Sequence, residues 1–158
     1  MIPRHITVSL ILVCLPILSV AGESTDKTLV SWVSLDNLTQ RGGSVLTIQY
    51  QDKFDAIVFG EKRPARWMAG SNFFARTQDE QKAYPKESAT PDMVIQMAVV
   101  YKGNTITIYR DGERYASYSA DNIDLLSPEK NMAVFGFRHA GATTGERFSG
   151  KIEDARIY

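Results

Sequence analysis

The sequence predicts an all-β domain built as an antiparallel β-sandwich, and three observations lead to this fold class. Short runs of β-branched and aromatic residues follow one another along the chain, separated by turn residues. The tight-turn pairs Gly103-Asn104 and Asp111-Gly112 stand between such runs, as they do in antiparallel hairpins. Apolar residues almost never recur at the 3.6-residue spacing of an amphipathic helix. An antiparallel sandwich or barrel fits this pattern better than a parallel α/β fold.

Length and charge restrict the classes of function. The chain has 158 residues, 44% of them hydrophobic, which suits one globular domain with its own core. It carries 18 basic and 18 acidic residues, so its net charge is zero. This balance gives no support for a nucleic acid or an anionic membrane surface as partner.

The N-terminal residues predict a cleaved signal peptide over residues 1–21. A short basic region precedes the apolar run Ile6–Leu18, and small residues follow up to Ala21. An uncleaved membrane anchor is the alternative, but the run is short for a span of roughly 20 residues and contains Pro16. We therefore expect a secreted or periplasmic protein that is not inserted in a membrane after cleavage. The single cysteine, Cys14, leaves with the signal, so the mature domain has no disulfide.

The first half of the mature chain predicts three strands joined by turns. Residues 28–35 alternate along their length, with apolar residues on both faces, so both faces of this strand are expected to be covered. Gly42-Gly43 marks the turn before a second strand at 44–50. A short polar connection then leads to a third strand at 54–60, and the last two strands are expected to form a β-hairpin.

The segment after this hairpin is harder to interpret. Residues 63–71 read as irregular because they contain Pro64, Gly70 and two arginines. Residues 72–77 predict a further short strand, and residues 78–91 a long polar loop.

The second half predicts a three-stranded meander followed by two more strands. Residues 93–101, 105–109 and 113–119 are β-prone runs joined by the two tight turns named above. Only residues 123–129 suggest a helical turn. The remaining predicted elements are a strand at 132–138, a loop at 139–145 and a last strand at 147–158.

Three stretches together resemble one family: Val99–Tyr115, Val134–Arg138 and Phe148–Tyr158. They are similar to the laminin-G-like, pentraxin-like jelly roll of concanavalin-A-like lectins, in which a late Phe-x-Gly-x-Ile-x-Asp strand closes the sheet. The positions that match are Tyr109, Asp111, Gly112, Phe148, Gly150, Ile152 and Asp154. The resemblance implies a jelly roll over residues 28–158. The middle segment also resembles the variant found in large exported bacterial multidomain proteins.

Two departures from the family pattern concern the ends of the domain. Such domains have an opening strand before the one at 28–35 and continue beyond the last one, so this chain is expected to lack the first and last family strands. It is a shortened relative, a gene fragment, or a subunit completed by a partner. A missing strand leaves an unpaired sheet edge, and this predicts strand pairing with another chain.

The sequence does not favour an enzyme. Glycosidases of this fold use a Glu-x-Asp-x-x-Glu cluster along one strand, and this chain has none. Glu153 and Asp154 are adjacent in a strand, so their side chains point to opposite faces. His139 is the only histidine after cleavage, and no Gly-x-Ser-x-Gly motif accompanies it.

The residues themselves predict no cofactor, but the resemblance implies calcium as a candidate. The family often holds calcium through Asp side chains and backbone carbonyls in loops at the rim of the sandwich. The candidate donors are Asp52, Asp55, Asp121 and Asp124.

The best set of ligand-binding candidates combines aromatic rings with planar polar groups, as sugar sites do. It consists of Arg63, Arg66, Trp67, Asn72 and Phe74. The alternative is structural: Trp67 and Phe74 fill one end of the sandwich, and Arg66 or Arg76 pairs with Glu61. The sequence thus predicts a noncatalytic binding module for a glycan or a protein surface. A structural or assembly domain is the second hypothesis.

Overall fold

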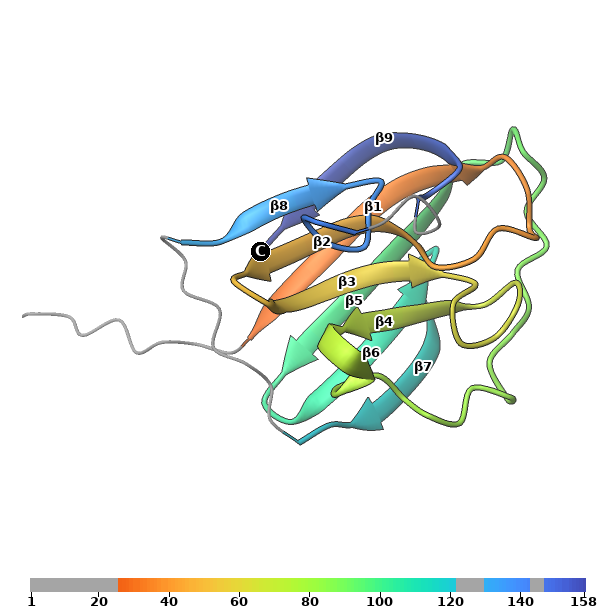
Figure 1. Ribbon diagram of the computed structural model, residues 1–158. Coiled ribbons are helices and arrows are strands. Elements are labelled where there is room, and N and C mark those ends of the chain that lie inside the picture. Colours follow the sequence, from red (N-terminus) through yellow and green to blue (C-terminus); the bar gives the residue numbers. More distant parts are fainter. Residues whose placement is uncertain (1–25, 122–129, 143–146) are drawn as a thin grey trace, which may run out of the picture.

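Two antiparallel sheets packed face to face form the protein, as a computed structural model shows (Figure 1). The structure describes residues 26–121, 130–142 and 147–158. The elements are β1 (Lys27–Leu35), β2 (Gly43–Tyr50), β3 (Lys53–Phe59), β4 (Trp67–Ser71), the 3-10 turn η1 (Asn72–Phe74), β5 (Ile95–Lys102), β6 (Thr105–Arg110), β7 (Glu113–Ser119), β8 (Met132–Phe135) and β9 (Gly150–Ile157). The predicted all-β sandwich is confirmed.

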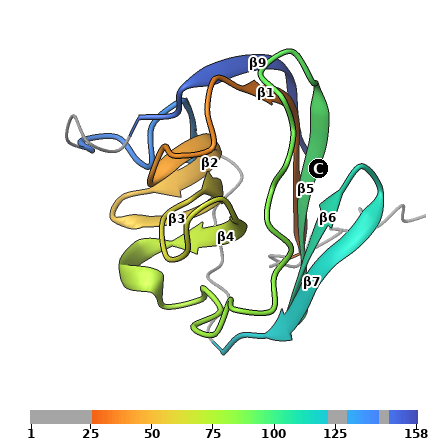
Figure 2. The same ribbon diagram turned by 90° about the vertical axis from the view of Figure 1, so that its right-hand side faces the viewer.

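Strand order separates the chain into a five-stranded sheet, β7-β6-β5-β1-β9, and a four-stranded sheet, β4-β3-β2-β8. The meander predicted over the second half is β5-β6-β7, with Val99 opposite Ile108 and Thr107 opposite Ser117. The predicted hairpin is β2-β3. Figure 2 shows the two layers from the side.

The core lies between the sheets and follows from the period of two in each strand. Leu29 and Val33 of β1 and Met97 and Val99 of β5 are fully buried. They belong to one cluster with residues of the facing sheet, among them Leu46, Ile57, Phe59 and Trp67. Burial of each such side chain contributes about 1.5–3 kcal/mol.

Two predictions about the segment after β3 are wrong. Residues 67–71 form a strand, β4, in which every residue is buried. Residues 72–77 are not a strand, because Phe73 and Phe74 have positive φ angles of 47° and 58°. The left-handed region interrupts any ladder of strand hydrogen bonds. The helical turn predicted at 123–129 lies outside the described residues.

The chain between β4 and β5 closes one side of the sandwich (Figure 2). There the Trp67 indole Nε1 donates to the Glu87 carboxylate at 2.8 Å, and Arg110 of β6 donates to the same carboxylate at 2.9 Å. This crossover thereby joins the edge strand of one sheet to the other sheet.

The opposite side ends in the edge strands β8 and β9, and both carry features that oppose strand addition. Glu153 falls between the paired positions 152 and 154, so β9 has a bulge. Charged residues line this strand, and β8 has only four residues. These features weigh against the predicted pairing with a strand of another chain.

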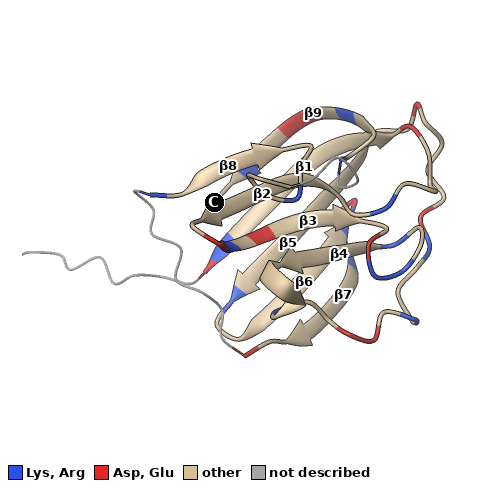
Figure 3. Ribbon diagram, in the orientation of Figure 1, with Lys and Arg blue, Asp and Glu red and all other residues tan. Residues whose placement is uncertain are grey.

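Charged residues lie in loops, at strand ends and along β9, with acidic and basic residues interspersed (Figure 3). No helix in the described residues is long and apolar enough to cross a membrane.

Candidate functional site

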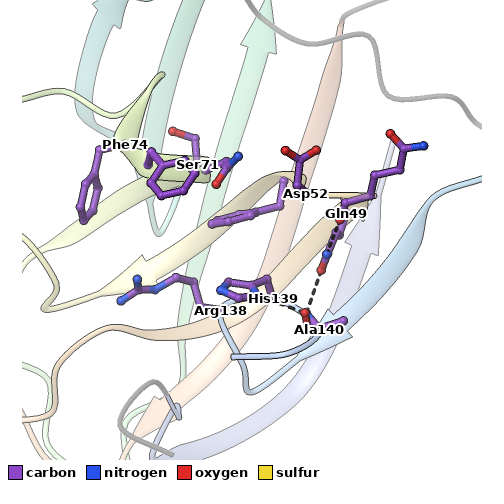
Figure 4. A pocket seen from close by; sticks show the side chains of 11 residues that line it. Gln49, Asp52, Ser71, Phe74, Arg138, His139 and Ala140 are labelled. Atoms are coloured by element: carbon purple, nitrogen blue, oxygen red, sulfur yellow. Dashed lines mark hydrogen bonds between the residues drawn. The ribbon is translucent and has the colours of Figure 1, made fainter. Parts of the chain in front are cut away.

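A pocket of about 560 Å³ lies over the four-stranded sheet, near the β2-β3 turn. Asp52 comes from the turn itself, Asn72, Phe73 and Phe74 from η1, and His139 from the loop after β8. In Figure 4, Phe74 and Asp52 lie on one side of the pocket and His139 on the other. We call it the rim pocket.

Aromatic rings supply the apolar part of the rim pocket. Phe73 is 91% exposed and Phe74 38% exposed, whereas Phe54 is buried. Phe54 and His139 stack with ring centroids 5.5 Å apart and an angle of 29° between their planes. The pocket therefore offers a ring that is almost wholly solvated beside rings that are held in place.

Phe73 and Phe74 are both backbone outliers. Bulky residues rarely adopt positive φ, and each such residue costs about 1–3 kcal/mol. Conformations of this kind persist only where the surrounding structure imposes them, and they cluster at ligand-binding sites. The strain makes this loop a candidate functional segment.

Polar groups in the rim pocket fall into two sets. Gln49 joins the two walls, because its Nε2 donates to the Gln51 carbonyl at 2.6 Å and its Oε1 accepts from the Ala140 N–H at 2.8 Å (Figure 4). In contrast, the Asp52 carboxylate and the Asn72 side-chain amide make no hydrogen bond or ion pair with described residues. These two groups are available to a ligand.

The five ligand-binding residues predicted from the sequence do not form one site. Asn72 and Phe74 line the rim pocket, but the other three lie elsewhere. Trp67 is 0% exposed, so its predicted role as a sugar platform is wrong, and its position inside the sandwich is that of the structural alternative. The Arg66 Nε donates to the Tyr84 carbonyl at 2.9 Å, and Arg63 lies on the surface beside Glu80.

The four calcium candidates are also dispersed. Asp55 is fully buried between Arg76 and Lys27, each 2.8 Å away, so its prediction as a calcium ligand is wrong. Asp52 lies in the rim pocket, Asp121 is exposed after β7, and Asp124 is outside the described residues. The described residues contain no group of three or more His, Cys, Asp or Glu side chains suited to a metal. Calcium binding through backbone carbonyls stays a prediction.

Sequence reasoning missed Phe73 as a site residue and considered His139 only as a catalytic group. The available signal was the pair of adjacent phenylalanines between a polar Ser-Asn pair and a polar loop. Two consecutive large apolar residues in such surroundings do not suit a half-buried strand, in which only alternate residues face the core.

Residues 12–158 match the family model of the Concanavalin A-like lectin/glucanases superfamily. The chain belongs to this superfamily. The match includes the whole predicted domain at 28–158 and confirms the resemblance seen in the sequence. The predicted signal peptide at 1–21 lies outside the described residues, and no curated protein matches the chain.

Solved structures of this superfamily's fold include three informative neighbours. Domain 4 of AbnA, an extracellular GH43 arabinanase from Geobacillus stearothermophilus solved with arabinotriose, has a TM-score of 0.61 and 16% identity over 85% of this chain and 60% of that one. A heptameric SAP-like pentraxin from Limulus polyphemus has a TM-score of 0.56 and 13% identity. The match covers 84% of this chain and 63% of the pentraxin chain. Domains LG4-5 of the mouse laminin α1 chain have a TM-score of 0.55 and 9% identity. The match covers 84% of this chain and 35% of the laminin chain. This chain thus spans less than two thirds of each, and at these identities the likeness shows the fold.

Proposed function

We propose that this chain is an exported, noncatalytic module that binds a neutral saccharide in the rim pocket. The observation that carries the proposal is Phe73, a phenylalanine 91% exposed in a strained backbone at the mouth of that pocket. An exposed ring of this kind suits the apolar C–H face of a sugar. The superfamily includes lectins, and the arabinanase domain was solved with a trisaccharide, which supports this class of ligand.

The polar groups of the rim pocket are suited to hydroxyl groups. A carboxylate accepts hydrogen bonds and a primary amide both donates and accepts, so Asp52 and Asn72 together match adjacent sugar hydroxyls. The unpaired negative charge of Asp52 disfavours uronic acids and sulfated sugars. Arg138 does not offset it, because its guanidinium pairs with Glu61. A neutral sugar is therefore the expected ligand.

The residues lining the pocket also support a noncatalytic role. Glycoside hydrolysis needs two carboxyl groups about 5–9.5 Å apart across the scissile bond. Asp52 is the only carboxylate among the described residues that line the rim pocket. An exported location is part of the proposal and rests on the N-terminal residues alone.

The test is binding of residues 22–158 to an array of neutral and acidic glycans, with and without calcium, followed by calorimetry on the best neutral oligosaccharide. Phe73→Ala is expected to weaken binding about tenfold, the loss of one stacking contact. Phe135→Ala is the matched control, because Phe135 is 51% exposed on β8, away from the pocket. A folded domain that binds no glycan, or equal losses in both variants, would refute the proposal.

Protein assembly is a second candidate, favoured by apolar side chains near the edge strands. Met132 and Phe135 of β8 and Ile157 of β9 are 41–51% exposed, and Tyr158 is 69% exposed. Contiguous exposed apolar surface is typical of protein interfaces. Sedimentation equilibrium of the wild type and of Phe135→Ser tests this candidate: concentration-dependent association lost in the variant supports it, and a monomer at all concentrations contradicts it.

A further inference from the structure

The loop that carries the two exposed phenylalanines is anchored at both of its ends. We call residues 71–77 the apex loop. At its start the Ser71 hydroxyl oxygen accepts from the Arg76 backbone N–H at 2.9 Å, which closes the loop on itself. At its end the Thr77 hydroxyl donates to the Ala69 carbonyl of β4 at 2.8 Å. Phe73 and Phe74 lie between these two fixed points.

Arg76 is the most strongly held residue of the apex loop. Its Nε and Nη2 donate to the same Asp55 carboxylate oxygen at 3.0 and 2.8 Å, and Nη2 also donates to the Phe54 carbonyl at 2.9 Å. Its own carbonyl accepts from the Tyr118 hydroxyl of β7 at 2.8 Å. The Arg76 side chain is 3% exposed and that of Asp55 is 0% exposed. Arg76 therefore connects the loop to the four-stranded sheet through the buried Asp55 and to the five-stranded sheet through the half-buried Tyr118.

Asp55 cannot release Arg76 without a large loss of interaction. Its other carboxylate oxygen lies 2.8 Å from Lys27 Nζ of β1, so the ion is held between two cations in the interior. A buried charge that loses a partner is strongly destabilised, because water does not replace the lost contact. The Arg76–Asp55 pair is thus strong enough to oppose the backbone strain at Phe73 and Phe74.

We infer that Arg76 is a positioning residue for the ligand site: its paired hydrogen bonds to Asp55 hold Phe73 and Phe74 in the left-handed conformation that displays them over the rim pocket. The role in ligand binding rests on the proposed function, but the mechanical coupling does not. If the pair is loosened, the apex loop relaxes out of the left-handed region. The site then loses its preorganisation.

The strain itself can be measured without any ligand, from the difference between glycine and alanine at position 73. Both substitutions remove the ring, but only glycine adopts positive φ without a steric penalty. In the intact loop, Phe73→Gly is expected to have an unfolding equilibrium constant about tenfold smaller than Phe73→Ala. In the Arg76→Lys background, which keeps the charge but loses the paired geometry, this advantage of glycine is expected to disappear.

A matched control comes from Ala65, which also has a positive φ, 53°, but lies outside the apex loop. Ala65→Gly is expected to give the same gain with Arg76 or with lysine at position 76. If Arg76→Lys does not fold, Ser71→Ala replaces it, since it removes the bond that closes the loop, together with the 3.2 Å contact between the Ser71 and Thr77 hydroxyls, and leaves the Arg76–Asp55 pair intact. Urea unfolding of each variant gives the equilibrium constants.

The outcomes separate this inference from the proposed function. A glycine advantage at position 73 that persists unchanged when Arg76 is replaced would overturn the inference, and so would its absence in the intact loop. Calorimetry with the neutral oligosaccharide that the wild type binds best then tests the ligand role: Arg76→Lys, while folded, is expected to bind about tenfold more weakly. If no saccharide binds while the glycine advantage behaves as expected, the proposed function fails and the positioning of the loop stands.

Discussion

Replacing Glu87 by alanine tests how the crossover between β4 and β5 is held. The Glu87 side chain is 1% exposed and accepts from the Trp67 indole, from Arg110 and from the backbone N–H groups of Ser88 and Ala89 at 2.8–3.0 Å. Glu87→Ala removes all of these acceptors at once. Among the described residues, the indole N–H has no other hydrogen-bond acceptor.

The magnitude follows from the burial of each partner. The Trp67 side chain has no access to water, so its unsatisfied N–H costs about 1–3 kcal/mol. The Arg110 side chain is 27% exposed, so its share is discounted because water replaces part of the contact. With the two backbone donors, we expect a loss of about 3–4 kcal/mol in the free energy of unfolding. For a domain of this size that lowers Tm by about 10 °C.

Urea denaturation followed by tryptophan fluorescence measures this loss at neutral pH. Glu87→Gln is the control, because its amide oxygen still accepts from the indole while the charge is gone, and we expect it to lose about half as much. A loss below about 1 kcal/mol for Glu87→Ala would refute the reasoning, since buried donors left without acceptors cost at least that much.

Three further predictions concern pH and backbone geometry. Burial opposes ionisation of Glu87, but its hydrogen bonds outweigh burial and lower its pKa. The stability that Glu87 contributes is therefore present above the unfolded pKa of about 4.3 and is lost as pH falls through the folded pKa. Acid unfolding of Glu87→Gln should show a weaker pH dependence than that of the wild type. Burial raises the pKa of Tyr84 and of Tyr115 to about 12, so absorbance titration of the folded protein should show tyrosines that ionise well above pH 10. Gly60→Ala should destabilise the fold by about 2 kcal/mol or more in thermal unfolding, because Gly60 has a φ of 75° and a Cβ there would lie 2.4 Å from the Gln40 carbonyl oxygen.

Most of the fold could be predicted because local patterns and sheet pairing agree. The meander from β5 to β7 depends on two tight turns whose residues specify hairpins, and these turns are local in sequence. β4 was missed for the opposite reason. Its residues include Gly70 and show no alternation, because both faces of the strand are covered. Such a strand gives no period-two signal.

The candidate site could be predicted only in part, because its chemistry depends on contacts between distant positions. Nothing in the spacing of Asp55 and Arg76 indicates that they form a buried pair, so Asp55, close to the β2-β3 turn, looked suited to calcium. Trp67 looked like a ligand platform because arginine precedes it and no pattern showed that it faces the core. The resemblance at the level of the fold did not establish the role of either residue, since one fold carries many different sites.

The place of the rim pocket follows from the register of the four-stranded sheet. Asp55 lies opposite Ser71 in the ladder, so the β2-β3 turn and the apex loop must emerge at the same end of the sheet. The Thr47 hydroxyl donates to the Arg138 carbonyl at 2.8 Å, and Gln49 accepts from Ala140, so the chain after β8 folds back over β2 toward that end. Three segments distant in sequence therefore meet there without any contribution from the other sheet. A ligand in this pocket would contact one sheet only, and it would leave exposed the apolar side chains Met132 and Phe135 of β8 and Ile157 of β9.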